Sequence, residues 1–176
     1  MASIFGHTLV AIGIAKTFPS KLTSTKFWIL GIICSILPDA DVIGFLYDVP
    51  YGSFWGHRGF THSFAFALAL AFLITLLFHR SELKSTRLLL FVAYYFLCTS
   101  SHALLDAMTT GGLGVAFFSP LDNSRYFFPW RPIKVSPLGA SKFFSTWGLQ
   151  VLKSELIWIG IPVVLWVRSV YLFRKK

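Results

Sequence analysis

The residues FTHSFAFALALAFLITLLF, at positions 60–78, decide the fold class of this chain. After the polar Thr61-His62-Ser63, the stretch is an almost unbroken series of Phe, Ala and Leu. About 20 consecutive apolar residues are enough for a helix to cross the hydrocarbon core of a bilayer. The stretch therefore predicts a membrane-spanning helix whose entrance carries a histidine.

The composition of the whole chain agrees with a membrane protein. Of its 176 residues 55% are hydrophobic and only 13% are charged, whereas soluble domains carry about 25% charged residues. The sequence predicts one membrane-embedded all-α domain over residues 1–176, a bundle of four to five hydrophobic helices with a long outer loop at 109–152. The further apolar segments are Ala2–Phe18, Phe27–Tyr47, Leu88–Met108 and Leu156–Phe173.

Positive charge is concentrated between the apolar segments. The net charge is +9, but the basic residues form no single patch of the kind that binds nucleic acid, so no nucleic-acid partner is expected. Three basic clusters, at 16–26, 80–87 and 174–176, fall on one side if every segment crosses the membrane. The positive-inside rule makes that side cytoplasmic. We expect a multi-pass protein of the cytoplasmic (inner) membrane, with membrane lipids as neighbours.

Most histidine and acidic residues fall at the outer end of this scheme, which uses only Lys and Arg. An ionised side chain inside a membrane costs about 2.5–3.5 kcal/mol even on a lenient scale, so it needs a partner or a task. Of the five histidines, only His79 falls at the cytoplasmic end. The residues expected to meet at the outer end and to bind metal are His7, Asp39, Asp41, His57, His62, His102, Asp106 and Glu155.

Two motifs place pairs of candidate ligands on helices. His102 and Asp106 are four residues apart, so they share one helix face, although a polar pair at a helix end has the same spacing. Asp39 and Asp41 follow Pro38, which weakens the helical hydrogen-bond ladder, and a kink there would aim both carboxylates inward. The alternative is a helix end at which Asp caps the next turn.

A third motif, residues 57–63, reads HRGFTHS and holds two imidazoles, a guanidinium and two hydroxyls. Imidazole is a common ligand of zinc and similar metals. The planar fork of Arg58 matches phosphate oxygens, but a lipid head-group contact would explain it equally well. Thr61 or Ser63 can instead cap the following helix, and Glu155 can complement the dipole of the last helix.

These motifs, taken in order from His7 to His102-x-x-x-Asp106, resemble the YdjM-like family of membrane-bound metal-dependent hydrolases. That family is distantly similar to zinc-dependent phospholipase C and P1 nuclease, which are all-α enzymes that hydrolyse phosphoesters with a zinc cluster. The soluble enzymes use an N-terminal Trp and a late HxxxE, whereas this chain has Met1 and places Val151 four residues before Glu155. The resemblance therefore implies one or two divalent ions, with zinc as the expected metal.

The sequence thus predicts a membrane-bound hydrolase that cleaves a phosphoester of a lipid or lipid-linked substrate on the outer, periplasmic side. A bound metal would acidify water and polarise the phosphoryl oxygen, Asp39 or Asp41 would act as general base, and Arg58 would neutralise phosphate charge. Two alternatives are a metal-ion or proton transporter and a non-catalytic protein with a structural metal. A transporter needs polar residues toward both faces, whereas the cytoplasmic halves of residues 60–78 and 156–173 are nearly all apolar.

Overall fold

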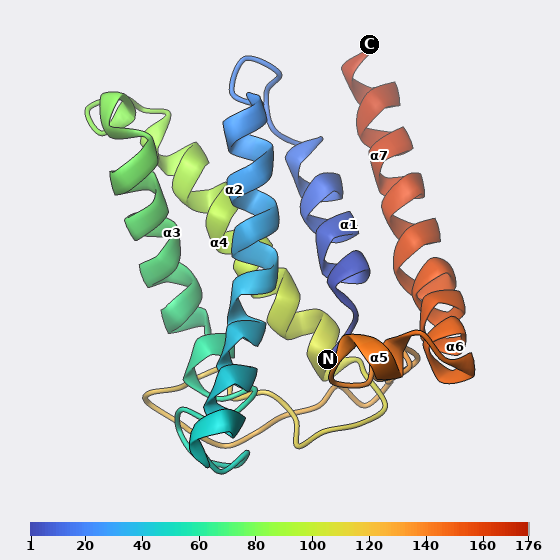
Figure 1. Cartoon of the computed structure of the whole chain (residues 1–176). Coiled ribbons are helices and arrows are strands. Elements are labelled where there is room, and N and C mark those ends of the chain that lie inside the picture. Colours follow the sequence, from blue (N-terminus) through green and yellow to red (C-terminus); the bar gives the residue numbers. More distant parts are fainter. Residues whose placement is uncertain (176) are drawn as a thin grey trace.

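Five rod-like helical units, roughly side by side, make up the computed structural model, which describes residues 1–175 (Figure 1). They are α1 (Ile4–Ala15), α2 (Thr25–Ile36) continued by the 3-10 helix η1 (Leu37–Tyr47), α3 (Phe64–Phe78), α4 (Leu88–Ala107), and a last rod formed by α6 (Thr146–Glu155), the π-helical turn η4 (Leu156–Gly160) and α7 (Ile161–Arg174). Short elements are η2 (Phe60–His62), η3 (Arg80–Glu82) and α5 (Ala140–Phe143). The prediction of an all-α helical membrane bundle is confirmed.

Serine side chains set where several helices begin. Ser63 accepts a hydrogen bond from the backbone N–H of Phe66, so α3 starts at Phe64 and not at Phe60. Ser24 caps α2 in the same way, and Ser145 caps α6. Because of this last cap, the final helix begins at Thr146, ten residues before the predicted start at Leu156. The predicted loop 109–152 therefore ends earlier than expected.

Three of the helical units are long and apolar enough to cross a membrane, namely Thr25–Tyr47, Leu88–Ala107 and Thr146–Arg174. The 12 residues of α1 and the 15 of α3 correspond to about 18 and 22 Å at 1.5 Å per residue. Both are shorter than the hydrocarbon core of about 30 Å. The two short helices are apolar nonetheless and pack against the long ones.

Helix α4 lies at the centre of the bundle, where it packs against α1, α2 and α3. The ring of Tyr94 on α4 stacks on that of Phe27 on α2, with 3.8 Å between their centroids. Gly31 leaves room for Tyr94, since any side chain at Gly31 would collide with the Tyr94 ring. In contrast, α7 stands at the edge of the bundle, next to α1, and has no buried residue (Figure 1).

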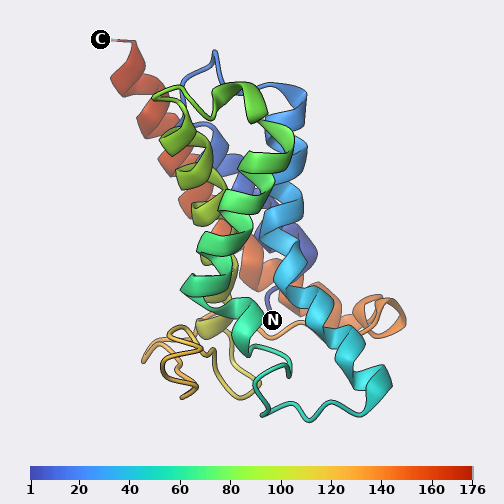
Figure 2. The ribbon, with the colours of Figure 1, turned by 90° about the vertical axis from the view of Figure 1, so that its left-hand side faces the viewer.

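The two ends of the bundle differ in charge and in structure. At one end, Lys26 donates a hydrogen bond to the carbonyl of Phe78, and Arg174 donates to the carbonyl of Thr17. The three basic clusters therefore share this end, which we call the basic end, as the alternating scheme predicted. At the opposite end, the loop end, η1 extends beyond α3, and the irregular connection that follows α4 lies at this same end (Figure 2).

Candidate metal centre

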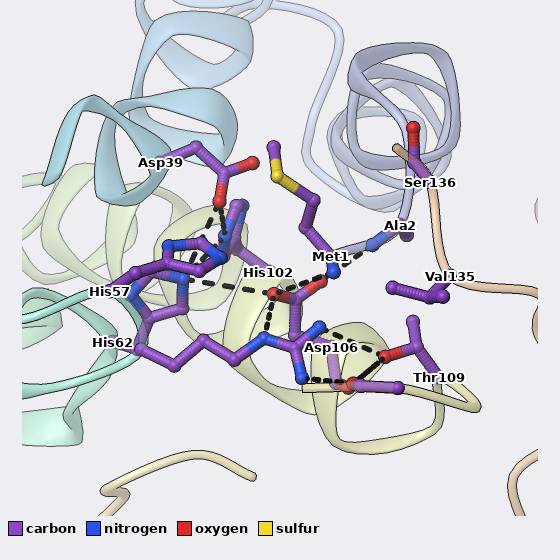
Figure 3. A network of polar contacts seen from close by, with 12 residues as sticks. Met1, Ala2, Asp39, His57, His62, His102, Asp106, Thr109, Val135 and Ser136 are labelled. Atoms are coloured by element: carbon purple, nitrogen blue, oxygen red, sulfur yellow. Dashed lines mark hydrogen bonds and ion pairs between the residues drawn. The ribbon is translucent and has the colours of Figure 1, made fainter. Parts of the chain in front are cut away.

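Four side chains from three elements meet inside the loop end of the bundle. Asp39 comes from η1, His62 from η2, and His102 and Asp106 from α4, and one ligand atom of each lies within 4.8 Å of all the others (Figure 3). Pro38 is the second residue of η1, so the helix changes its winding just before Asp39. Because His102 and Asp106 are one helical turn apart, both face the same interior space. We call these four residues the metal cluster.

The distances within the metal cluster match those between ligands of one small metal ion. His62 Nε2 lies 3.0 Å from His102 Nε2 and 3.6 Å from Asp39 Oδ1, and His102 Nε2 lies 3.3 Å from Asp39 Oδ1. Asp106 Oδ2 is 3.8 Å from His62 Nε2. Ligands about 2.0–2.1 Å from a tetrahedral zinc ion are about 3.3 Å from one another. The four atoms therefore fit around one ion with little movement.

Hydrogen bonds outside the metal cluster determine which nitrogen of each imidazole faces inward. His102 Nδ1 lies 2.7 Å from the carbonyl oxygen of Ser35, which can only accept, so Nδ1 carries the proton. His62 Nδ1 lies 3.2 Å from Asp41 Oδ2, a second acceptor. Both Nε2 atoms then direct lone pairs at each other across 3.0 Å. Two facing lone pairs repel unless a cation or a proton lies between them.

The electrostatics of the metal cluster favour a positive charge at this point. Burial, the largest influence, lowers the pKa of His62, but the neighbouring carboxylates of Asp39 and Asp41 outweigh it and raise the pKa to about 9. A neutral His62 would leave two buried carboxylates beside it without that positive charge. A divalent cation would replace the proton and satisfy the same carboxylates.

His7 adds a further imidazole beside the metal cluster. Its ring is fully buried, stacks on His102 at 3.8 Å between centroids, and places Nε2 3.5 Å from Asp106 Oδ1. Neither ring nitrogen has a hydrogen-bond partner among the described residues, and Asp39 Oδ1 has none either. Buried polar atoms without partners are rare in folded proteins. Their position suits ligands of one ion or of a second ion next to it.

Arg58 holds Asp106 in place. Its Nε donates to Asp106 Oδ2 at 3.0 Å, while its other nitrogens donate to the carbonyl of Gly111 and to the hydroxyl of Thr109. The guanidinium is fully buried. These contacts favour a positioning role for Arg58 over the predicted contact with a substrate phosphate. Gly112, at φ +92°, passes so close to Arg58 Nη1 that a side chain would collide with it.

Asp41 is the centre of a second group of three, Asp41, His57 and His62. Its Oδ1 lies 2.7 Å from His57 Nδ1, while its Oδ2 accepts from the backbone N–H of Arg58 and the hydroxyl of Thr61. A carboxylate that orients a metal-binding imidazole commonly has this position. Asp39, in contrast, keeps an oxygen without a hydrogen bond, so we assign Asp39 to the ligand set and Asp41 to positioning.

The structure places Glu155 outside both groups. Its carboxylate accepts hydrogen bonds from the backbone N–H and the hydroxyl of Ser3, which precedes α1. Ala2, one residue earlier, donates its N–H to Asp106 Oδ1 at 2.7 Å. Glu155 therefore anchors the segment that reaches the metal cluster. His79 lies at the basic end, as predicted, where its Nε2 is 2.7 Å from the hydroxyl of Tyr95.

Several residues of the site were missed in the sequence. Ser35, Thr109 and the glycines at 111 and 112 contribute a carbonyl, a hydroxyl and close backbone contacts. The Gly111-Gly112 pair, which follows shortly after α4, could have indicated a close backbone contact here, because glycine allows such an approach. No comparable signal marked Ser35.

Comparison with known proteins agrees with this picture of a membrane protein. The family described as "YdjM inner membrane protein" matches residues 1–176. The inner membrane protein YbcI of Escherichia coli (strain K12) is 40% identical over 167 residues, which cover 94% of each chain. No solved structure matches. The chain is thus an inner membrane protein and belongs to the YdjM family.

Proposed function

We propose that this protein is a membrane-bound, metal-dependent hydrolase of phosphoesters. The observation that carries the proposal is the pair of imidazole nitrogens, Nε2 of His62 and Nε2 of His102, that lie 3.0 Å apart beside two carboxylates. Bound there, a zinc ion would lower the pKa of a water molecule to about 7 and polarise a phosphoryl oxygen. Asp39, His62, His102 and Asp106 form the proposed ligand set, and His7 is the candidate for a second ion.

Asp39 is the residue with the best position to meet a substrate. The side chain of Asp39 is 13% exposed, whereas those of the other three members of the metal cluster are fully buried. A general base must reach the attacking water directly. Asp39 therefore combines a place in the metal cluster with access from outside, and it is the proposed base. Asp41 and Arg58 would hold His62 and Asp106 in place.

A lipid or lipid-linked phosphoester is the proposed substrate. The loop end exposes large apolar and aromatic side chains, among them Leu46, Tyr47, Trp55 and Phe144. Aromatic side chains are enriched where a membrane meets water. This end would therefore lie at head-group height, and the positive-inside rule assigns it to the periplasmic side.

A structural metal site is the second candidate, and burial is the observation that favours it. His62, His102 and Asp106 have no exposed side-chain surface. Closed metal sites with full protein ligation are typically structural, whereas catalytic sites keep an open position for water. Turnover, and not metal content, separates the two candidates.

The test begins with the metal content of detergent-purified protein, measured by mass spectrometry for the natural chain, His62→Ala and Asp106→Ala. His79→Ala is the matched control, because it also removes a buried imidazole but lies at the basic end. We expect about one ion or more per chain in the natural protein and His79→Ala, with a large loss in the other two. Equal, substoichiometric metal in all four would refute the metal site.

The second step measures hydrolysis of bis(p-nitrophenyl) phosphate and of a phospholipid in mixed micelles. We expect turnover that a chelator abolishes and that added zinc restores. Asp39→Asn should lose turnover even when enough zinc is added to saturate the site. A metal-loaded protein without turnover on either substrate would support the structural candidate instead.

A further inference from the structure

A groove runs between α1 and α7 on the side of the bundle away from α3. It has a volume of about 570 Å³, and its walls are apolar side chains from both helices, including Leu9 and Ile12 of α1 and Val164 and Val167 of α7. Figure 1 shows α7 as the outermost rod, next to α1. We call this feature the α1–α7 groove. It is separate from the metal cluster, and the proposed hydrolase does not use it.

The groove lies beside a close contact between α1 and α7. A Cβ atom added to Gly13 would come within 2.8 Å of Val163 Cγ1, so the two helices meet there at the closest distance that glycine allows. Beside this contact the helices are far enough apart to leave the groove open. Since α7 has no buried residue, whatever fills the groove supplies much of its packing.

Three basic residues line the part of the groove nearest the basic end. They are Lys16, Arg168 and Arg174. Arg174 donates to the carbonyls of Thr17 and Phe18, and the Lys16 ammonium lies 5.0 Å from the ring centroid of Trp28. Within residues 1–175 none of the three cations pairs with a carboxylate. The acidic residue of the basic end, Glu82, faces Arg87 at 3.9 Å.

We infer that the α1–α7 groove binds an anionic phospholipid. An acyl chain would lie along the valines of α7, and the phosphate would meet Lys16, Arg168 and Arg174. Basic pockets between membrane helices on the cytoplasmic side are suited to anionic head groups. The long side chain of Arg168 would extend toward the head-group region while its methylenes remain in the apolar part. Zwitterionic lipids offer no net charge to balance these cations, so the groove should select against them.

The experiment is a titration of the full-length protein in detergent with phosphatidylglycerol or phosphatidylcholine, followed by native mass spectrometry. We expect at least one retained phosphatidylglycerol per chain and much weaker retention of phosphatidylcholine. The double substitution Lys16→Gln/Arg168→Gln should weaken phosphatidylglycerol binding about thirtyfold, which corresponds to about 1 kcal/mol for each basic residue. Val167→Trp should also weaken binding, because it fills the groove and leaves its charge unchanged.

The matched control is Arg80→Gln/Lys84→Gln, which removes two charges from the same end but outside the groove. It should bind phosphatidylglycerol like the natural chain, and all variants should keep their metal content and unfolding midpoint. Equal losses in both double variants would reduce the effect to diffuse attraction and overturn the proposal. Equal retention of both lipids, or a dimer that excludes lipid from the groove, would overturn it as well.

Discussion

Replacing Asp41 tests whether this residue orients the metal-binding imidazole of His62 or binds the metal itself. Asp41→Asn keeps the shape but offers His62 Nδ1 an amide, which lacks the charge of a carboxylate and can present an N–H. We expect zinc affinity to fall about 10- to 100-fold, as for other carboxylates behind a metal-binding imidazole. Competition with a chromophoric chelator measures this change. Asp48→Asn, on an exposed residue at the end of η1, is the control. Complete loss of metal in Asp41→Asn would instead make Asp41 a direct ligand.

Gly112 tests how tightly the chain encloses Arg58. Gly112→Ala adds a Cβ about 2.5 Å from Arg58 Nη1 at a φ of +92°, while Gly139→Ala adds one at +93° with nothing within 4 Å. The backbone strain is therefore matched, of the order of 1–3 kcal/mol, and only Gly112→Ala displaces the guanidinium that holds Asp106. We expect both to lower the thermal unfolding midpoint and only Gly112→Ala to lower metal content. Equal metal in both variants would mean that Arg58 is not needed to hold Asp106.

At the scale of the element, the start of α3 connects helix capping to the metal cluster. Ser63→Ala removes the N-cap of α3 directly after His62, and Ser24→Ala removes the same kind of cap from α2 at the basic end. Each change should cost about 1 kcal/mol of stability. Metal affinity should fall in Ser63→Ala alone, because only this cap fixes a ligand-bearing turn. A parallel fall in Ser24→Ala would show that metal loss merely follows destabilisation.

The helical segments were predictable from the sequence because their apolar runs are long, whereas their ends were not. Ser63 and Ser145 stop or start a helix through one local hydrogen bond, which hydropathy does not register. The meeting of His62, His102 and Asp39 followed from the alternating topology alone. The roles of Arg58 and Glu155 did not, because they depend on how residues 109–139 and the segment before α1 fold back.

For the whole molecule, the difference in net charge between the two ends predicts its orientation in the membrane. The loop end is close to neutral, because six of the seven acidic residues lie at or near it together with six basic ones. The basic clusters give the other end its net positive charge. The six basic residues of the loop end are Arg58, Arg125, Arg131, Lys134, Lys142 and Lys153. Helices α1 and α3 are shorter than the hydrocarbon core. The metal cluster can therefore lie deeper in the membrane than the head groups of the nearer leaflet, while the surrounding helices shield it from acyl chains. The positive-inside rule predicts that the basic end stays in the cytoplasm, since lysine and arginine near short loops resist translocation.

A labelling experiment on spheroplasts tests this predicted orientation. The two native cysteines, Cys34 and Cys98, are buried and should not react with a bulky reagent. Leu121→Cys places a thiol at the loop end on a residue that is 96% exposed, and Lys84→Cys places one at the basic end. A membrane-impermeant maleimide should label Leu121→Cys in spheroplasts and Lys84→Cys only after permeabilisation, because the positive-inside rule places the basic end in the cytoplasm. The reverse pattern would place the proposed hydrolase site at the cytoplasmic face. Any phosphoester that reaches the metal cluster would then come from the cytoplasmic side.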